Sequence, residues 1–244
     1  MPDEWQFSQI RFTAFSADPK TDLEGTFEAF FGFAPESRST QKAQFLTEVS
    51  ARRDNVVYRV LAAGPKIDIT VDAAAAEAGV APPALPMLPL PQETRETFVV
   101  SSSNILERLR EVRRLAVGEH RLLPVNSRVE AYKRMATFLP GVSLDPEGST
   151  DFFYQINRPR KYRVGNQDVK INRLSHWLGI VLSVTVTAGN ISQTTPVADA
   201  ISLTTDVNSA VEIDVSTFNT GEHRHLVETL FAFSSEIAEK GDIP

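Results

Sequence analysis

Apolar and polar residues alternate along four stretches in the first third of the chain, which is the pattern of half-buried β-strands. In the clearest of them, residues 66–72, three β-branched residues occupy one face and acidic or hydroxyl side chains occupy the other. The alternation over residues 5–15 slips near Gln9, which predicts a β-bulge there. The four predicted strands cover residues 5–15, 44–51, 56–62 and 66–72.

A helical pattern separates the first two of these strands. Thr21 and Glu24 have the spacing of a capping box, in which each side chain satisfies a free backbone amide of the first turn. The apolar residues between Leu23 and Phe31 then recur on one helical face, and Gly32 marks the end of the helix. The first third therefore predicts a β-α-β-β-β unit, an antiparallel sheet with one helix packed on it.

A proline-rich segment then interrupts both kinds of pattern. Five prolines fall within residues 82–91, and they exclude a helix or a central strand there. We therefore predict an extended crossing segment over residues 81–97, between a sheet region at 1–80 and a second region at 98–244. The two regions can form separate domains or join in one domain, and the sequence leaves both arrangements open.

The second region is predicted to contain two helices, an antiparallel sheet and a final helix. Asn104, Ser127 and Asn219 each precede a glutamate by three residues, which is the spacing of a capping box. The helical face that starts at Asn104 continues in the sequence to Ala116. The predicted strands cover residues 152–157, 169–186 and 200–207. Strands that are separated from helices along the chain indicate the α+β class, with helices packed on one face of the sheet.

Several common chemistries have no counterpart in the sequence. The chain has no cysteine, which excludes disulfides and thiolate ligands, and the common glycine-rich phosphate loops, zinc-binding helix motif and serine elbow are absent. No metal and no cofactor is therefore predicted, and an enzyme is the less favoured class. An acidic N-terminus, with no apolar run long enough to cross a bilayer, predicts a cytoplasmic protein.

Charge is distributed unevenly along the chain, whose net charge is −6. Residues 104–176 carry 14 Lys and Arg against 8 Asp and Glu, whereas residues 177–244 carry 2 against 9. The basic region and the acidic tail can attract each other within one fold, or they can meet between protomers of a homo-oligomer. A basic region can also bind an anionic partner such as a nucleic acid.

Asp151, Asp168 and Lys170 imitate the pattern of metal-dependent nucleases. In those enzymes two carboxylates hold a divalent ion and a lysine steadies the attacking water. The pattern is short and unspecific, because Asp18-Pro19-Lys20 matches the same tripeptide. These three residues are the weak catalytic candidates of the sequence.

The most distinctive feature is the tripeptide Ile-Asn-Arg, which occurs at 156–158 and again at 171–173 on neighbouring predicted strands. If the strands pair, their basic residues form a patch flanked by aromatic rings, which can hold phosphates and stack bases. The alternative is a structural network in which the Asn and Arg side chains lock a turn and bind Asp151 or Asp168. The candidate binding residues are Asn157, Arg158, Arg160, Lys161, Arg163, Asn172, Arg173 and Trp177.

The same part of the chain resembles a group of uncharacterised bacterial proteins of similar length. The resemblance lies in residues 152–160, 171–177, 202–209 and 236–242. It implies a bacterial, stand-alone chain, and the sporadic distribution of the broader family suits an accessory or defence-linked role. It transfers no activity and no site residue.

Three functions follow as hypotheses. The first is a non-enzymatic binding or assembly protein that uses its charge asymmetry to engage a protein partner or itself. The second is a nucleic-acid-binding protein that uses the strand pair from Arg158 to Arg173. The third is a metal-dependent nuclease. No membrane partner is predicted.

Overall fold

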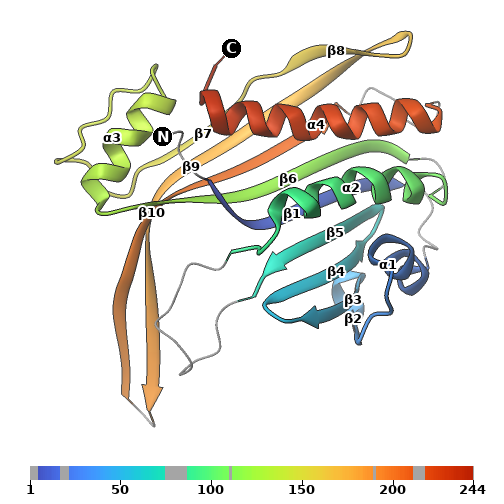
Figure 1. Ribbon diagram of the computed structural model, residues 1–244, viewed down its shortest axis with the longest axis horizontal. Helices are drawn as coiled ribbons and strands as arrows, with labels where there is room; N and C mark the ends of the chain where they lie inside the picture. Colours follow the sequence, from blue (N-terminus) through green and yellow to red (C-terminus); the bar gives the residue numbers. More distant parts are fainter. Residues whose placement is uncertain are drawn as a thin grey trace.

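Alternation of apolar and polar residues in both halves of the chain builds one antiparallel sheet in the computed structural model (Figure 1). The structure describes residues 5–16, 22–74, 87–109, 112–188, 191–210 and 218–243. The strands are β1 (Gln6–Ser16), β2 (Ser37–Gln41), β3 (Leu46–Arg53), β4 (Val56–Ala63), β5 (Lys66–Ala73), β6 (Val112–Val125), β7 (Phe153–Asn157), β8 (Arg160–Val164), β9 (Gln167–Ala188) and β10 (Ile191–Ser209). The helices are α1 (Leu23–Phe31), α2 (Pro91–Leu106), α3 (Arg128–Phe138) and α4 (Thr220–Lys240), with a short 3₁₀ helix η1 (Lys42–Gln44).

The sheet has the strand order β2-β3-β4-β5-β1-β6-β10-β9-β7, with β8 also paired to β9. Strand β1 lies at its centre, because it pairs with β5 on one side and with β6 on the other. The strands on either side of the proline-rich segment therefore share one continuous sheet. This arrangement is one of the two that the sequence allows.

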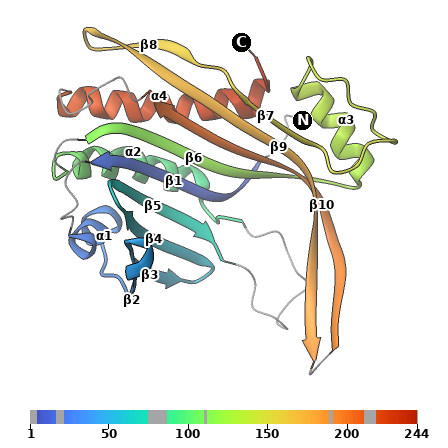
Figure 2. The same ribbon diagram turned by 180° about the vertical axis from the view of Figure 1, so that it is seen from behind.

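The helices pack on one face of this sheet, which confirms the predicted α+β class. Helix α2 lies between α1 and α4, and α4 lies over β6 and β10. Figure 2 shows the opposite face, with the strands in front of α2 and α4. The main core lies under the helices, where Ile10, Phe12, Val60, Ile69 and Leu203 have no exposed surface.

The structure contradicts the helix predicted from Asn104 onward. Helix α2 begins earlier, with Pro91 at its first turn, and ends at Leu106, so Asn104 lies inside its last turn. Residues 112–125, which include Ala116, form the central strand β6. A central strand is buried on both faces, and its nearly continuous apolar run also fits a helical period. The crossing segment predicted over 81–97 is likewise helical from Pro91, and residues 75–86 lie outside the described residues.

Three other local predictions are confirmed. The ladder between β1 and β6 shifts register between Phe7 and Gln9, which is the predicted bulge. Ser127 caps α3, and Asn219 forms a complete capping box at the start of α4. At α1 the cap is Asp22, whose side chain accepts a hydrogen bond from the Gly25 amide, and Thr21 lies outside the described residues.

Strands β2 and β8 were not predicted from the sequence. Strand β2 consists of polar residues that are all exposed, so no apolar alternation marks it. Strand β8 has alternating burial, but Arg160 shares the inner face with Tyr162 and Val164, and three of its five residues are basic, which concealed the pattern. Both strands lie at the edge of the sheet, where burial constrains the sequence least.

The end of α4 depends on Gly241, which has φ 74° and ψ −152°, a region that only glycine occupies readily. A Cβ atom there would overlap the backbone carbonyl of Phe138, to which the Asp242 amide donates a hydrogen bond of 2.8 Å. We predict that Gly241→Ala lowers the free energy of unfolding by about 2 kcal/mol or more, measured by urea denaturation. Gly141→Ala is the control, because a Cβ at Gly141 meets no atom within 4 Å. Equal stability of the two variants would contradict the prediction.

Candidate functional site

The two Ile-Asn-Arg steps lie side by side, as the sequence predicts for paired strands. The Asn157 side chain donates to Asn172 Oδ1 at 3.2 Å and accepts from the Arg173 amide at 2.9 Å. The Arg158 amide donates to the Arg173 carbonyl at 3.1 Å. Asn172 in turn donates to Asn208 on β10 at 3.0 Å. The asparagines therefore link three strands by a ladder of side-chain hydrogen bonds.

The arginines of this region bind the C-terminal end of the same chain. Arg158 makes two hydrogen bonds to Asp242, at 2.7 and 2.9 Å. Arg160 and Arg173 both reach Glu236 on α4, at 2.8 and 3.1 Å. The basic region and the acidic tail thus meet within one fold. The structural network predicted as an alternative exists, but its acids are Glu236 and Asp242 in place of Asp151 or Asp168.

The remaining candidate binding residues divide between the surface and the core. Lys161 and Arg163 are exposed on β8, where Lys161 lies directly opposite Lys170. Trp177 is fully buried, stacks on Phe138 at 5.4 Å and meets the edge of Trp5 at 6.0 Å. Trp177 is therefore a core residue, which corrects the prediction that it flanks an exposed binding surface.

The three nuclease candidates do not come together. Phe153 pairs with Leu178, which places Asp151 beyond that end of the β7–β9 ladder. Asp168 pairs with Arg163 near the start of β9, so the two aspartates lie about 30 Å apart along the strand. Within the described ranges, no group of three His, Cys, Asp or Glu side chains is placed to hold a metal ion.

A buried ion triad, which sequence reasoning missed, lies between the sheet and the helices. Glu119 on β6 has no exposed side-chain surface and binds Arg95 of α2 at 2.7 Å. Its other oxygen contacts Arg121 and the hydroxyl of Ser234 on α4. Burial lowers the pKa of Arg95, and the adjacent Glu119 carboxylate opposes this shift. The sequence gives no signal for the triad, because Arg95 lies on α2 whereas Glu119 and Arg121 lie on β6.

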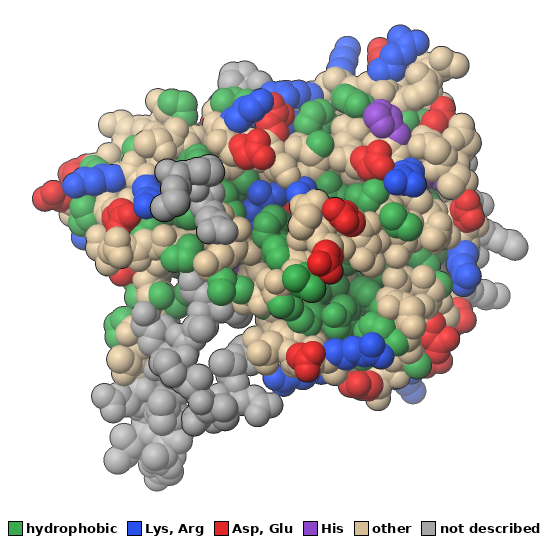
Figure 3. Space-filling model, in the orientation of Figure 1, with side chains coloured by type: hydrophobic (Ala, Val, Ile, Leu, Met, Phe, Trp, Pro, Cys, Tyr) green, Lys and Arg blue, Asp and Glu red, His purple; other side chains and the backbone are tan. Residues whose placement is uncertain are grey.

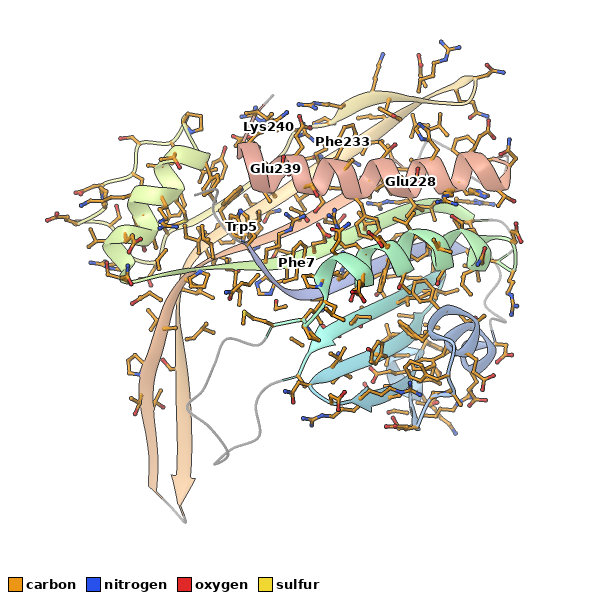
Figure 4. All side chains as sticks on the ribbon, in the orientation of Figure 1. Trp5, Phe7, Glu228, Phe233, Glu239 and Lys240 are labelled. Atoms are coloured by element: carbon orange, nitrogen blue, oxygen red, sulfur yellow. The ribbon has the colours of Figure 1, made fainter. Side chains whose placement is uncertain are left out.

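Arg95 joins α2 to α4 at the floor of a groove. Its guanidinium donates to the Phe231 carbonyl at 2.9 Å and to Ser235 Oγ at 2.8 Å. The groove above it has a volume of about 540 Å³, and Glu228 lies on its α4 side (labelled in Figure 4). Acidic and basic side chains are interspersed over this face of the molecule (Figure 3). The groove therefore presents no surface of one charge sign.

A two-stranded arm projects from the sheet, and we define it as residues 182–188 of β9 and 191–198 of β10. The ladder of β7 with β9 ends at Leu178, and the ladder of β6 with β10 ends at Asp199. Beyond these points β9 and β10 pair with each other and project away from the sheet (Figures 1 and 2). The arm extends about 25 Å. Residues 174–198 contain no Asp, Glu, Lys or Arg, so the arm carries no charged side chain.

No protein-family model matches the chain, and no curated protein matches its sequence. Over the described part of the chain, the helices are too short or too polar to span a membrane. The function must therefore be inferred from the residues and their geometry.

The contact between Arg158 and Asp242 predicts a dependence of stability on pH. The hydrogen bond from Arg158, opposed by burial and assisted by Tyr154, lowers the pKa of Asp242. A carboxyl whose pKa is lowered by folding stabilises the protein above its unfolded pKa, near 4, and this contribution is lost as pH falls. The stability advantage of the wild type over Asp242→Asn should therefore shrink between about pH 5 and pH 2.5, measured by urea denaturation. If the difference in the free energy of unfolding between the two proteins stayed constant over that range, the lowered pKa of Asp242 would be ruled out as its source.

The buried triad predicts that removing only its carboxylate lowers the free energy of unfolding far more than removing all three charges. Glu119→Gln leaves two buried guanidinium groups without a carboxylate, and we expect a loss of about 3–5 kcal/mol in the free energy of unfolding. The triple variant Arg95→Met, Glu119→Leu, Arg121→Met removes all three charges. Its free energy of unfolding should lie within about 1 kcal/mol of the wild-type value, or be higher. A triple variant less stable than Glu119→Gln would show that the ion pairs themselves stabilise the fold.

Proposed function

We propose that this chain is a non-enzymatic binding and assembly protein, which engages a protein partner by adding a strand to its arm. The observation that carries the proposal is the arm itself. Beyond Leu178, β9 pairs with β10 on one side, and among the described residues no strand pairs with its other edge over residues 182–188. Such an edge is a template for another strand.

The stability of the arm also supports a partner. A two-stranded ribbon in water is marginally stable, and a third strand or a packed surface is needed to stabilise it further. The sequence from Gly179 to Ala188 is rich in Val, Ile and Thr, which favour strands, and it contains no proline. The arm is therefore suited to pair with another strand along its length.

The charge asymmetry favours a protein partner over a nucleic acid. Arg158 is paired with Asp242, and Arg160 and Arg173 share Glu236, so all three guanidinium groups already bind an acid of the same chain. A nucleic-acid site would need these cations to be free to bind phosphates. A bacterial accessory or defence-linked setting, which the resemblance of the C-terminal half implies, would suit a binding protein of this kind.

The test is whether the arm accepts a strand. A fluorescently labelled peptide of alternating Val and Thr residues should bind the purified chain, measured by anisotropy at nanomolar chain concentration. Ser183→Pro removes an arm N–H and should weaken binding at least tenfold, whereas Ser183→Ala, which keeps that N–H, should leave it unchanged. No binding by the wild type, or equal binding by Ser183→Pro, would overturn the proposed function.

A further inference from the structure

The two outer edges of the arm differ in how well they are protected against pairing with another strand. On β10, Pro196 lacks an N–H, and the ladder shifts register between Pro196 and Ala198. Proline and bulges are the devices by which proteins stop an edge from pairing with another strand. On β9, residues 182–188 contain neither a proline nor a charged residue, and their ladder with β10 contains no other register shift. The β9 edge of the arm is therefore the one open to a partner.

The other edge strands of the sheet are short or carry charge. Strand β7, which ends the strand order, is uncharged but has only five residues, Phe153–Asn157. Strand β2 is short and fully exposed, and it carries Arg38, which is paired with Glu24. Strand β8 carries Lys161 and Arg163 on its exposed face. Charged side chains on an edge oppose the approach of a second sheet. Among the described strands, the β9 edge of the arm alone combines length with the absence of charge.

We infer that the strand added to this edge is β9 of a second copy of the same chain. The inference rests on the proposed function and names its partner. Two copies related by a two-fold axis place identical edges antiparallel, which gives a closed pair with one set of contacts used twice. The product is a four-stranded sheet in the order β10-β9-β9-β10, whose outer edges are both blocked by Pro196. Assembly therefore stops at two chains.

Charge does not oppose the pairing of two copies at this edge. Each chain has a net charge of −6, and none of that charge lies on the arm. Antiparallel pairing of the arms places the two bodies at opposite ends of the shared ribbon, separated by about the 25 Å length of the arm. That separation exceeds the screening length of about 8 Å at physiological salt, so the like charges of the bodies interact weakly.

The register of the arm shows which backbone group would be used. Ser183 pairs with Pro196 across the arm. A proline in a ladder has its nitrogen on the outer side, so this pair is of the kind in which both residues direct their N–H and C=O groups outward. The Ser183 amide therefore points out of the β9 edge. Ser183→Pro would block this edge as Pro196 blocks the other, without removing a hydrogen bond inside the arm.

The experiment is light scattering on the purified full chain over a range of concentrations. The wild type should approach twice the 27.0 kDa mass of one chain. Ser183→Pro should raise the dissociation constant at least tenfold, and Ser183→Ala should not change it. Pro196→Thr restores an N–H to the β10 edge and should yield species larger than two chains. A wild type that stays monomeric at all concentrations would overturn the inference.

If Ser183→Pro does not fold, a second measurement tests whether β9 of a second copy pairs with the arm. In the wild type, amide hydrogen exchange across residues 178–188 should slow as the chain concentration rises, because the β9 edge becomes paired. Exchange independent of concentration would count against the second copy. If the Val-Thr peptide binds the arm but the chain stays monomeric, the proposed function stands and the second copy is excluded. If neither occurs, both fail.

Discussion

The pairing of β6 with β1 on one side and β10 on the other is the constraint on which the structure depends. Strand β6 joins the two halves of the chain into one sheet, and it carries Glu119 to the centre of the helix-covered face. Helix α4 can lie over β6 and β10 because Ser234 and Arg95 supply the polar partners that a buried carboxylate requires. Without β6, the sheet would divide between β1 and β10.

The acidic end of α4 makes a second set of contacts that fixes the opposite half of the sheet. Arg173 has only 1 % of its side chain exposed and reaches Glu236, while Arg158 reaches Asp242 just beyond the helix. A buried guanidinium without a carboxylate would be costly, so Arg173 requires Glu236 of α4 at this place on the sheet, and Arg158 adds a more exposed contact at the end of the helix. The positive charge of this region, which the sequence offers to a partner, therefore binds acidic residues at the end of α4. The arm, by contrast, is uncharged and projects from the sheet.

Local features could be predicted from the sequence wherever the residues that determine them lie close together along the chain. The caps at Ser127 and Asn219, the bulge near Gln9 and the pairing of the two Ile-Asn-Arg steps all follow from spacing within short stretches. Strand β6 was missed because double-sided burial removes the alternation that marks a strand. The partners of Arg158 and Arg173 could not be predicted, because they lie 84 and 63 residues away along the chain. The triad at Glu119 could not be predicted either, because Arg95 reaches Glu119 from a different element, α2.

The base of the arm is packed against the rest of the protein. This packing affects the conformational entropy that the arm would lose on pairing with another strand. Its strands continue β9 and β10, whose inner halves contain the fully buried residues Trp177 and Val207. At its base, Tyr132 of α3 packs so closely on Gly179 that a Cβ there would lie 2.6 Å from the ring. Packing at the base restricts the conformations of the two strands, so the arm would lose less conformational entropy on pairing than an isolated ribbon would. The packed base and the β9 edge therefore have complementary roles: the base positions the strand, and no described strand pairs with its outer edge over residues 182–188.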